Sequence, residues 1–89
     1  MSNALRGYDL RVGKLYVFVH DDQAYTKHVW RSPTDFQYQK SLGELTTADW
    51  FVYLGSQDPN LWWGRVLTSN GTVGWLMLGS EEFTECIPS

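Results

Sequence analysis

Few residues of this chain have the types and spacing that catalysis or metal binding requires. Nucleophilic catalysis needs a nucleophile, a base and a group that orients the base. Cys86 is the only cysteine, and His20 and His28 are the only histidines. Cys86 lies in a short apolar segment, where a buried structural thiol is common, and two histidines eight residues apart are a weak zinc ligand set. We therefore expect a protein that is not an enzyme and holds no metal or cofactor.

Aromatic residues point more strongly to a binding site, because tryptophan, tyrosine and arginine dominate the energetics of protein interfaces. The 89 residues include five tryptophans, five tyrosines and four phenylalanines. Strand alternation places Trp63 and Arg65 on one face, and Trp62, Gly64 and Val66 on the other. Because arginine is rarely buried without a partner, Trp63 is expected to face solvent or a groove. A surface patch and a set of rings that only cover a small core both fit this pattern.

The segment that must position these residues is a β-hairpin over residues 61–78, with Asn70-Gly71 between two apolar runs. Asn-Gly is a strong signal for a tight turn, since both residues tolerate positive φ angles. A two-residue turn places Val66 opposite Trp75, and a three-residue turn with a glycine bulge shifts the partners by one. We expect Trp75 to pack in the core across from Val66.

The remaining segments predict a small all-β barrel of five or six short antiparallel strands. The strands are expected at residues 14–20, 50–54, 61–68, 72–78 and 83–87. Residues 21–40 are interpreted as an irregular hairpin, and residues 42–49 as a turn that leads into the next strand. Residues 1–13 are expected to form a flexible lead-in, which leaves residues 14–89 as a single domain.

Three motifs carry a resemblance to a known family. Leu15-Tyr16-Val17-Phe18 is similar to the opening strand motif Ala-Leu-Tyr-Asp-Phe, and Gly43-Glu44-Leu45 is similar to a diverging turn. Trp63-Gly64-Arg65-Val66, followed by Gly71-Thr72-Val73-Gly74-Trp75, matches Trp-x-x-Val and Gly-x-x-Gly-Trp. Together they resemble an SH3-like barrel over residues 14–87, closest to bacterial SH3 domains. The resemblance is more specific for the fold than for a function.

The resemblance implies a ligand-binding loop at residues 21–40, with Asp21 and Asp22 where SH3 domains hold acidic ligand-binding residues. It also implies recognition of a peptide, of a cell-wall peptide or glycan, or of a cationic side chain in an aromatic cage. The proline and tyrosine of the SH3 Pro-Ser-x-Tyr element are replaced by Met77-Leu78-Gly79-Ser80. This difference disfavours a polyproline ligand.

Charge and hydropathy restrict the partners. The formal net charge is −3, which argues against binding to a nucleic-acid backbone. The longest apolar run, residues 15–19, is too short to cross a membrane, and no segment has the pattern of a secretion signal. We therefore expect a cytoplasmic protein with no membrane partner.

The sequence predicts an interaction module that binds a peptide segment or a partner protein through an aromatic surface patch. The candidate ligand-binding residues are Trp63, Tyr16, Phe18, Asp21, Asp22, Tyr25, Tyr38 and Arg65. Two alternatives remain open: a ligand-recognition domain of the bacterial SH3 type, and a small subunit that associates with itself as a homo-oligomer.

Overall fold

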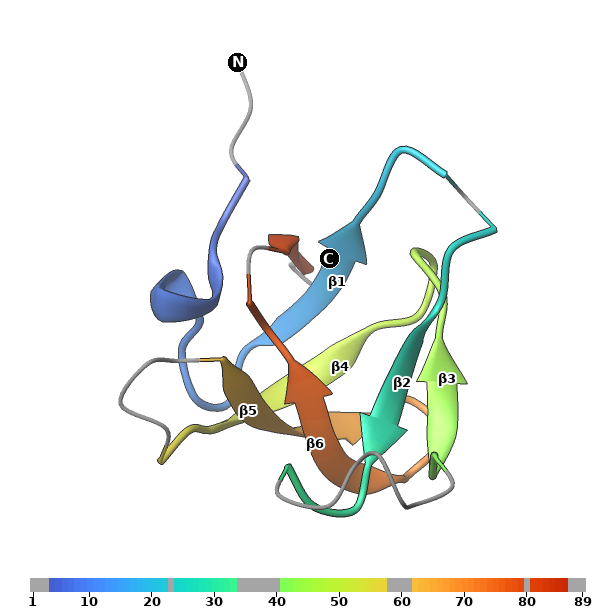
Figure 1. Cartoon of the computed structure of the whole chain (residues 1–89). Coiled ribbons are helices and arrows are strands. Elements are labelled where there is room, and N and C mark those ends of the chain that lie inside the picture. Colours follow the sequence, from blue (N-terminus) through green and yellow to red (C-terminus); the bar gives the residue numbers. More distant parts are fainter. Residues whose placement is uncertain (1–3, 23, 34–40, 58–61, 80, 87–89) are drawn as a thin grey trace.

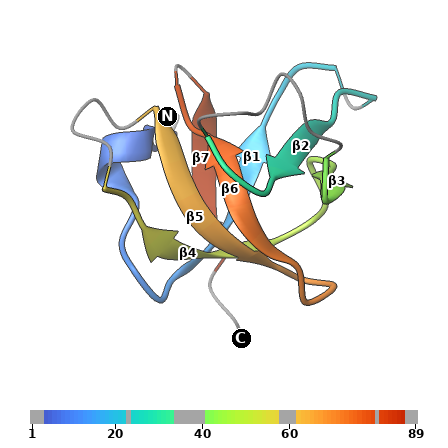
Figure 2. The ribbon, with the colours of Figure 1, turned by 60° about the horizontal axis from the view of Figure 1, so that its bottom comes forward.

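The computed structural model describes residues 4–22, 24–33, 41–57, 62–79 and 81–86. One antiparallel sheet of seven strands curls into a half-barrel, with the strand order β3-β2-β6-β5-β4-β1-β7 (Figures 1 and 2). The elements are η1 (Gly7–Asp9), β1 (Leu15–Val19), β2 (Lys27–Trp30), β3 (Gly43–Leu45), β4 (Phe51–Gly55), β5 (Trp63–Thr68), β6 (Val73–Met77) and β7 (Glu82–Cys86). The expected all-β class is confirmed. No helix in the described residues is long and apolar enough to cross a membrane.

Of the seven strands, β2 lies within the expected irregular hairpin of residues 21–40, whereas β3 was not expected as a strand. β2 pairs with β3 through Lys27 and Leu45, and with β6 through Val29 and Leu76. Residues 42–49 were expected to form only a turn, but Gly43–Leu45 pairs along the edge of the sheet. Both strands are short and pair with distant parts of the chain, so local sequence patterns identify them poorly. The sheet has seven strands, where five or six were expected.

The core fills the concave side of the curled sheet. Its most deeply buried side chains, each less than 2% exposed, are Tyr16, Phe18, Phe51, Phe83, Leu76, Leu78, Val29 and Val66. Tyr16 and Phe18 were expected on the ligand-binding patch, and the structure places them in the core instead. β1 lies between β4 and β7, so on the inner face Tyr16 lies beside its cross-strand partner Phe51, and Phe18 lies beside its cross-strand partner Phe83.

The expected flexible lead-in before β1 contributes to the folded body. Leu5 forms a two-way backbone bridge with Phe83, in which each amide donates to the other residue's carbonyl at 2.7 and 2.8 Å. Leu10 is 8% exposed and belongs to the core cluster. The 3₁₀ turn of η1 between them brings the chain from the edge of β7 toward the start of β1 (Figure 1).

Of the two turns that the sequence allows, the hairpin of β5 and β6 has the three-residue turn and not the two-residue turn. Thr68 and Thr72 close the turn with a 2.8 Å backbone hydrogen bond, and Gly71 adopts a φ of 91°. Val66 consequently faces Gly74, while Arg65 faces Trp75. The expectation that Trp75 packs in the core is wrong, because a one-residue shift of register reverses the face that each side chain occupies.

Candidate functional site

Aromatic and apolar side chains line the convex side of the sheet, where strand alternation points them away from the core. The inward residues of these strands, such as Val29, Leu76 and Val66, are fully buried. Their neighbours along β2, β6, β5 and β4 point the opposite way. We call this surface the outer face. It consists of His28, Trp30, Val52, Leu54, Trp63, Arg65, Leu67, Val73, Trp75 and Met77.

Arg65 occupies the centre of the outer face and is its only lysine, arginine or acidic residue. Trp75 lies directly opposite it on β6, and Trp30 lies opposite Trp75 on β2. On its own strand, Arg65 is flanked two residues away by Trp63 and Leu67. The Arg65 side chain is exposed, and within the described residues no hydrogen bond or ion pair engages its guanidinium. A solvated cation therefore sits among large apolar groups.

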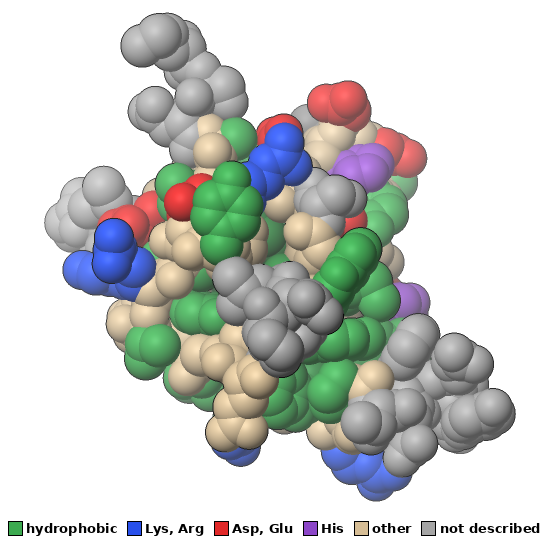
Figure 3. All heavy atoms as spheres, turned by 60° about the vertical axis from the view of Figure 1, so that its left-hand side comes forward, with side chains coloured by type: hydrophobic (Ala, Val, Ile, Leu, Met, Phe, Trp, Pro, Cys, Tyr) green, Lys and Arg blue, Asp and Glu red, His purple; other side chains and the backbone are tan. Residues whose placement is uncertain are grey.

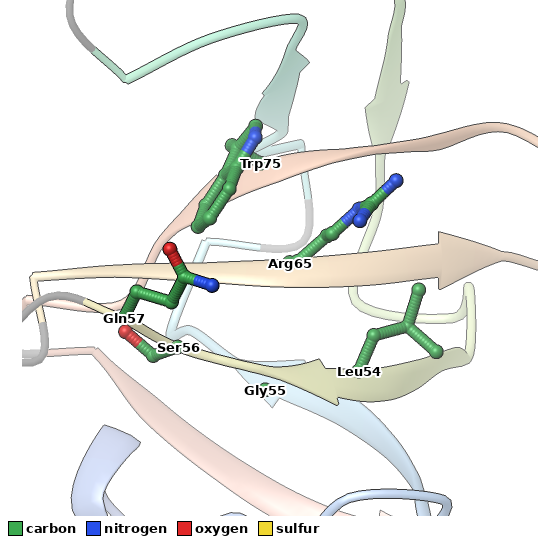
Figure 4. A pocket seen from close by; sticks show the side chains of 6 residues that line it. All are labelled: Leu54, Gly55, Ser56, Gln57, Arg65 and Trp75. Carbon is green, nitrogen blue, oxygen red and sulfur yellow. The ribbon is translucent and has the colours of Figure 1, made fainter.

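A hollow of about 390 Å³ opens beside Arg65. Its walls are Leu54, Gly55, Ser56, Gln57, Arg65 and Trp75. Figure 4 shows the Trp75 indole and the Arg65 guanidinium projecting from neighbouring strands, with Gln57 and Ser56 along the opposite side. The volume is within the range typical of ligand sites, but the hollow is open to solvent.

The segment after β4 shapes one wall of this hollow. The pairing of β4 with β5 shifts register between Tyr53 and Gly55, which is a β-bulge. Gly55 adopts a φ of 120°, a conformation that favours glycine. The Ser56 hydroxyl then donates a hydrogen bond to the backbone carbonyl of Trp63, which ties this segment to β5. Bulges commonly redirect a strand beside a functional site.

The composition of the hollow suits binding rather than bond breaking. Trp75 offers an apolar ring, Gln57 offers an amide that donates and accepts, and Arg65 offers a planar set of five donors. Figure 3 shows hydrophobic side chains gathered over the middle and lower part of one side of the molecule, with charged groups nearer its margin. The tryptophans of the outer face are partly exposed beside an exposed arginine, and this combination of residues makes the surface a candidate for protein recognition.

The structure brings together two of the predicted ligand-binding residues, Trp63 and Arg65. Asp21, Asp22 and Tyr25 lie instead in the connection between β1 and β2, where both aspartates are exposed and Tyr25 packs against the core. Tyr38 lies outside the described residues.

The connection between β1 and β2 is held by a cluster of its own. The ring of Tyr25 stacks on that of His20, with centroids 3.9 Å apart. The hydroxyl of Tyr25 donates to Glu81 at 3.3 Å, and the ammonium of Lys27 lies 3.3 Å from the same carboxylate oxygen. A shallow hollow of about 280 Å³ beside it is lined by Val19, His20, Asp21, Glu81 and Glu82.

Burial governs the ionisation of this cluster. The Lys27 side chain is only 6% exposed, and desolvation lowers the pKa of Lys27, although the charge of Glu81 opposes that change. Desolvation also raises the pKa of Tyr25, and the neighbouring carboxylate of Glu81 raises it further. Lys27 and Glu81 join the beginning of β2 to the connection that precedes β7. The cluster therefore has a structural task, which is to hold the two ends of the curled sheet together.

Sequence reasoning missed Trp75, Trp30 and the segment Ser56-Gln57. Trp75 and Trp30 share the outward alternation of their strands with Trp63 and Arg65. The signal available in the sequence was Gly74, the glycine that precedes Trp75. In the structure, a β-carbon at Gly74 would lie 2.5 Å from the Val29 side chain and 2.8 Å from the backbone oxygen of Trp30. A glycine inside a strand often marks such a close approach, and it places the following tryptophan on the outside.

The residues considered for catalysis are not gathered at one place. Cys86 is a free thiol of intermediate exposure on β7, and its partner on β1 is Leu15. His28 lies 3.6 Å from Glu44, while His20 stacks on Tyr25. Among the residues that the structure describes, no group of three or more histidine, cysteine or acidic side chains could hold a metal ion.

Comparisons with protein-family models, with curated proteins and with solved structures gave no match to this chain.

Proposed function

We propose that this chain is a non-catalytic interaction module that binds a peptide segment or a partner protein through its outer face. The observation that carries the proposal is the arrangement around Arg65, an exposed cation with Trp75 across the strand pair and Trp63 beside it. Tryptophan and arginine are the residues most enriched among interface hot spots. Tryptophans that served only to fill the core would point inward, as Phe51 and Phe83 do.

We also propose that the half-barrel is a divergent SH3-like barrel, closest to bacterial SH3 domains. The order of its elements supports this. β1 is followed by a long excursion, β4 to β6 form a meander with a three-residue turn, and β7 returns to pair with β1. Because Cys86, the only cysteine, is a free thiol, a reducing compartment such as the cytoplasm suits the protein.

The alternatives make different use of the same surface. A cage for a cationic side chain is disfavoured, since Arg65 would repel the ligand from the centre of the outer face. A cell-wall glycan could stack on Trp75 and bond to Gln57, both of which line the hollow. Self-association would cover the outer face of one copy with another copy, and would appear as concentration-dependent sedimentation.

The proposal is tested by selecting binders from a displayed library of random peptides on the immobilised protein. We expect enriched peptides to lose about tenfold or more in affinity for Trp63→Ala and for Trp75→Ala, which are hot-spot-sized losses. The matched control is Trp62→Ala. Trp62 is 53% exposed, and its ring lies against Gly79 rather than on the outer face.

Two results would contradict the proposal. One is a set of enriched peptides that depend on Trp62 and bind both outer-face variants normally. The other is the failure of any peptide to be enriched while the free protein remains monomeric at all concentrations. Retained folding of each variant is checked by circular dichroism before its binding is compared.

A further inference from the structure

We propose that the partner segment presents a single carboxylate side chain to Arg65, with apolar side chains on both sides of that carboxylate. This inference rests on the proposed function and specifies the chemistry of the partner. It starts from the position of Arg65, the only lysine, arginine or acidic residue on the outer face and the only lysine or arginine within residues 41–89.

Docking would remove water from the Arg65 guanidinium. The side chain is now exposed, and the described part of the chain offers it no counter-ion. Burying a charge without a partner is strongly unfavourable. A purely apolar partner would therefore lose much of the affinity that it gains on Trp63 and Trp75. A partner that supplies an anion avoids this loss and gains charge-assisted hydrogen bonds.

A carboxylate fits this position better than other groups. The guanidinium is planar and never deprotonates, and its fork of donors matches the two oxygens of a carboxylate. A nucleic acid would bring many phosphates toward an acidic chain with a formal net charge of −3. A lysine or arginine in the partner would leave two like charges in contact, which disfavours binding.

The spacing on β5 suggests how the partner is patterned. Trp63 and Leu67 flank Arg65 at two residues on either side, and along an extended strand this spacing is about 7 Å. An extended peptide that lies along β5 presents alternate side chains at the same interval. The matching pattern has aspartate or glutamate at the centre and apolar residues two positions before and after it.

The test uses three synthetic peptides of one length, each capped at both ends. Their centres read Leu-Ser-Glu-Ser-Leu, Leu-Ser-Gln-Ser-Leu and Leu-Ser-Lys-Ser-Leu. Binding at millimolar concentration and low salt is followed by NMR, through the indole N–H signals of Trp63 and Trp75. We expect the glutamate peptide to bind about fivefold or more tightly than the glutamine peptide, with weaker binding of the lysine peptide.

Variants separate the effect of charge from that of shape. In Arg65→Gln the preference for the glutamate peptide should disappear, and in Arg65→Glu it should reverse toward the lysine peptide. Arg11→Gln is the matched control, because Arg11 is exposed and lies outside the outer face. If Arg11→Gln prefers the glutamate peptide over the glutamine peptide as the wild type does, the preference is assigned to Arg65.

The outcomes distinguish the two proposals. Equal binding of the glutamate and glutamine peptides, with both indole signals shifted, overturns the carboxylate inference and leaves the outer face as a binding site. Absence of any shift at Trp63 and Trp75 with all three peptides overturns the carboxylate inference. If peptides enriched from the random library also leave these indole signals unshifted, that result contradicts the proposed function as well.

Discussion

At the scale of single residues, the least exposed ion pair among the described residues joins the buried Lys27 to the partly buried Glu81. The Lys27 ammonium lies 3.3 Å from Glu81, and the two side chains are 6% and 23% exposed. Removing one member of a buried pair leaves the other charge without compensation. Lys27 is the more deeply buried of the two, so removing Glu81 should cost more free energy of unfolding than removing Lys27.

We expect Glu81→Gln to lower the free energy of unfolding by roughly 3 kcal/mol. Lys27→Met combined with Glu81→Gln should recover much of this loss, because no charge then remains buried at this position. Urea denaturation of the single and double variants measures the effect. A single variant as stable as the wild type would show that the pair does not hold the ends of the sheet together.

The same pair predicts a pH dependence. The pKa of Lys27 is lowered by burial from its ordinary value of 10.5, so between the two pKa values the unfolded chain binds more protons than the folded one. Stability contributed by this group therefore rises with pH across that window. The loss in Glu81→Gln should be largest near neutral pH and should shrink as the pH rises toward 10.5. A loss that grows with pH in this range would contradict the assignment.

Trp75 and Leu76 test which face each side chain of β6 occupies. Leu76 is completely buried, whereas Trp75 points to the outer face with intermediate exposure. Leu76→Ala should cost roughly 2–5 kcal/mol of stability, and Trp75→Ala roughly 1 kcal/mol. Thermal melts compare the two variants. A larger loss for Trp75→Ala would mean that the hairpin faces are reversed.

At the scale of elements, Gly74 controls how closely β2 can approach β6. A β-carbon at Gly74 would lie 2.5 Å from the Val29 side chain and 2.8 Å from the backbone oxygen of Trp30. Contacts this short force the strands apart, and the backbone oxygen cannot rotate away as a side chain can. The junction of β2 and β6 therefore depends on the absence of a side chain at this position.

We expect Gly74→Ala to destabilise the protein by about 2 kcal/mol, a value in the range for overpacked sites. Gly43→Ala on β3 is the control, since a β-carbon there meets nothing within 4 Å. It should change stability by less than about 0.5 kcal/mol. Equal unfolding midpoints for the two variants in urea would show that β2 and β6 are not as close as described.

The elements also show what the sequence could predict. β1, β4, β5, β6 and β7 were all expected within a few residues of their observed bounds, because each is a local run of β-branched and aromatic residues. The bounds of β2 within residues 21–40, and the existence of β3, were not predicted, because their pairing joins distant residues. The turn at Gly71 left two registers open, and only the observed pairing selects between them.

The sequence also predicted the candidate site only where local alternation decides the direction of a side chain. Trp63 and Arg65 could be placed outward from alternation along one strand. Trp75 and Trp30 could not, because their positions depend on register and on the neighbour of β6. Tyr16 and Phe18 were expected on the ligand-binding patch, but β1 lies between β4 and β7, and both of these side chains point into the core.

At the scale of the whole molecule, the two parts of the predicted site lie in different regions. The outer face carries Trp63, Trp75 and Arg65, while the connection between β1 and β2 carries Asp21, Asp22 and Tyr25. The second region is tied to the core through Tyr25 and Glu81. We therefore propose to assign recognition to the first region and stability to the second.

The most direct test of this assignment is a map of backbone and indole N–H chemical shifts on titration with a peptide enriched from the random library. The assignment predicts that the largest changes occur at Trp63, Arg65 and Trp75, with small changes at His20 and Tyr25. Changes concentrated at His20, Asp21 and Tyr25, with the outer face unperturbed, would contradict it.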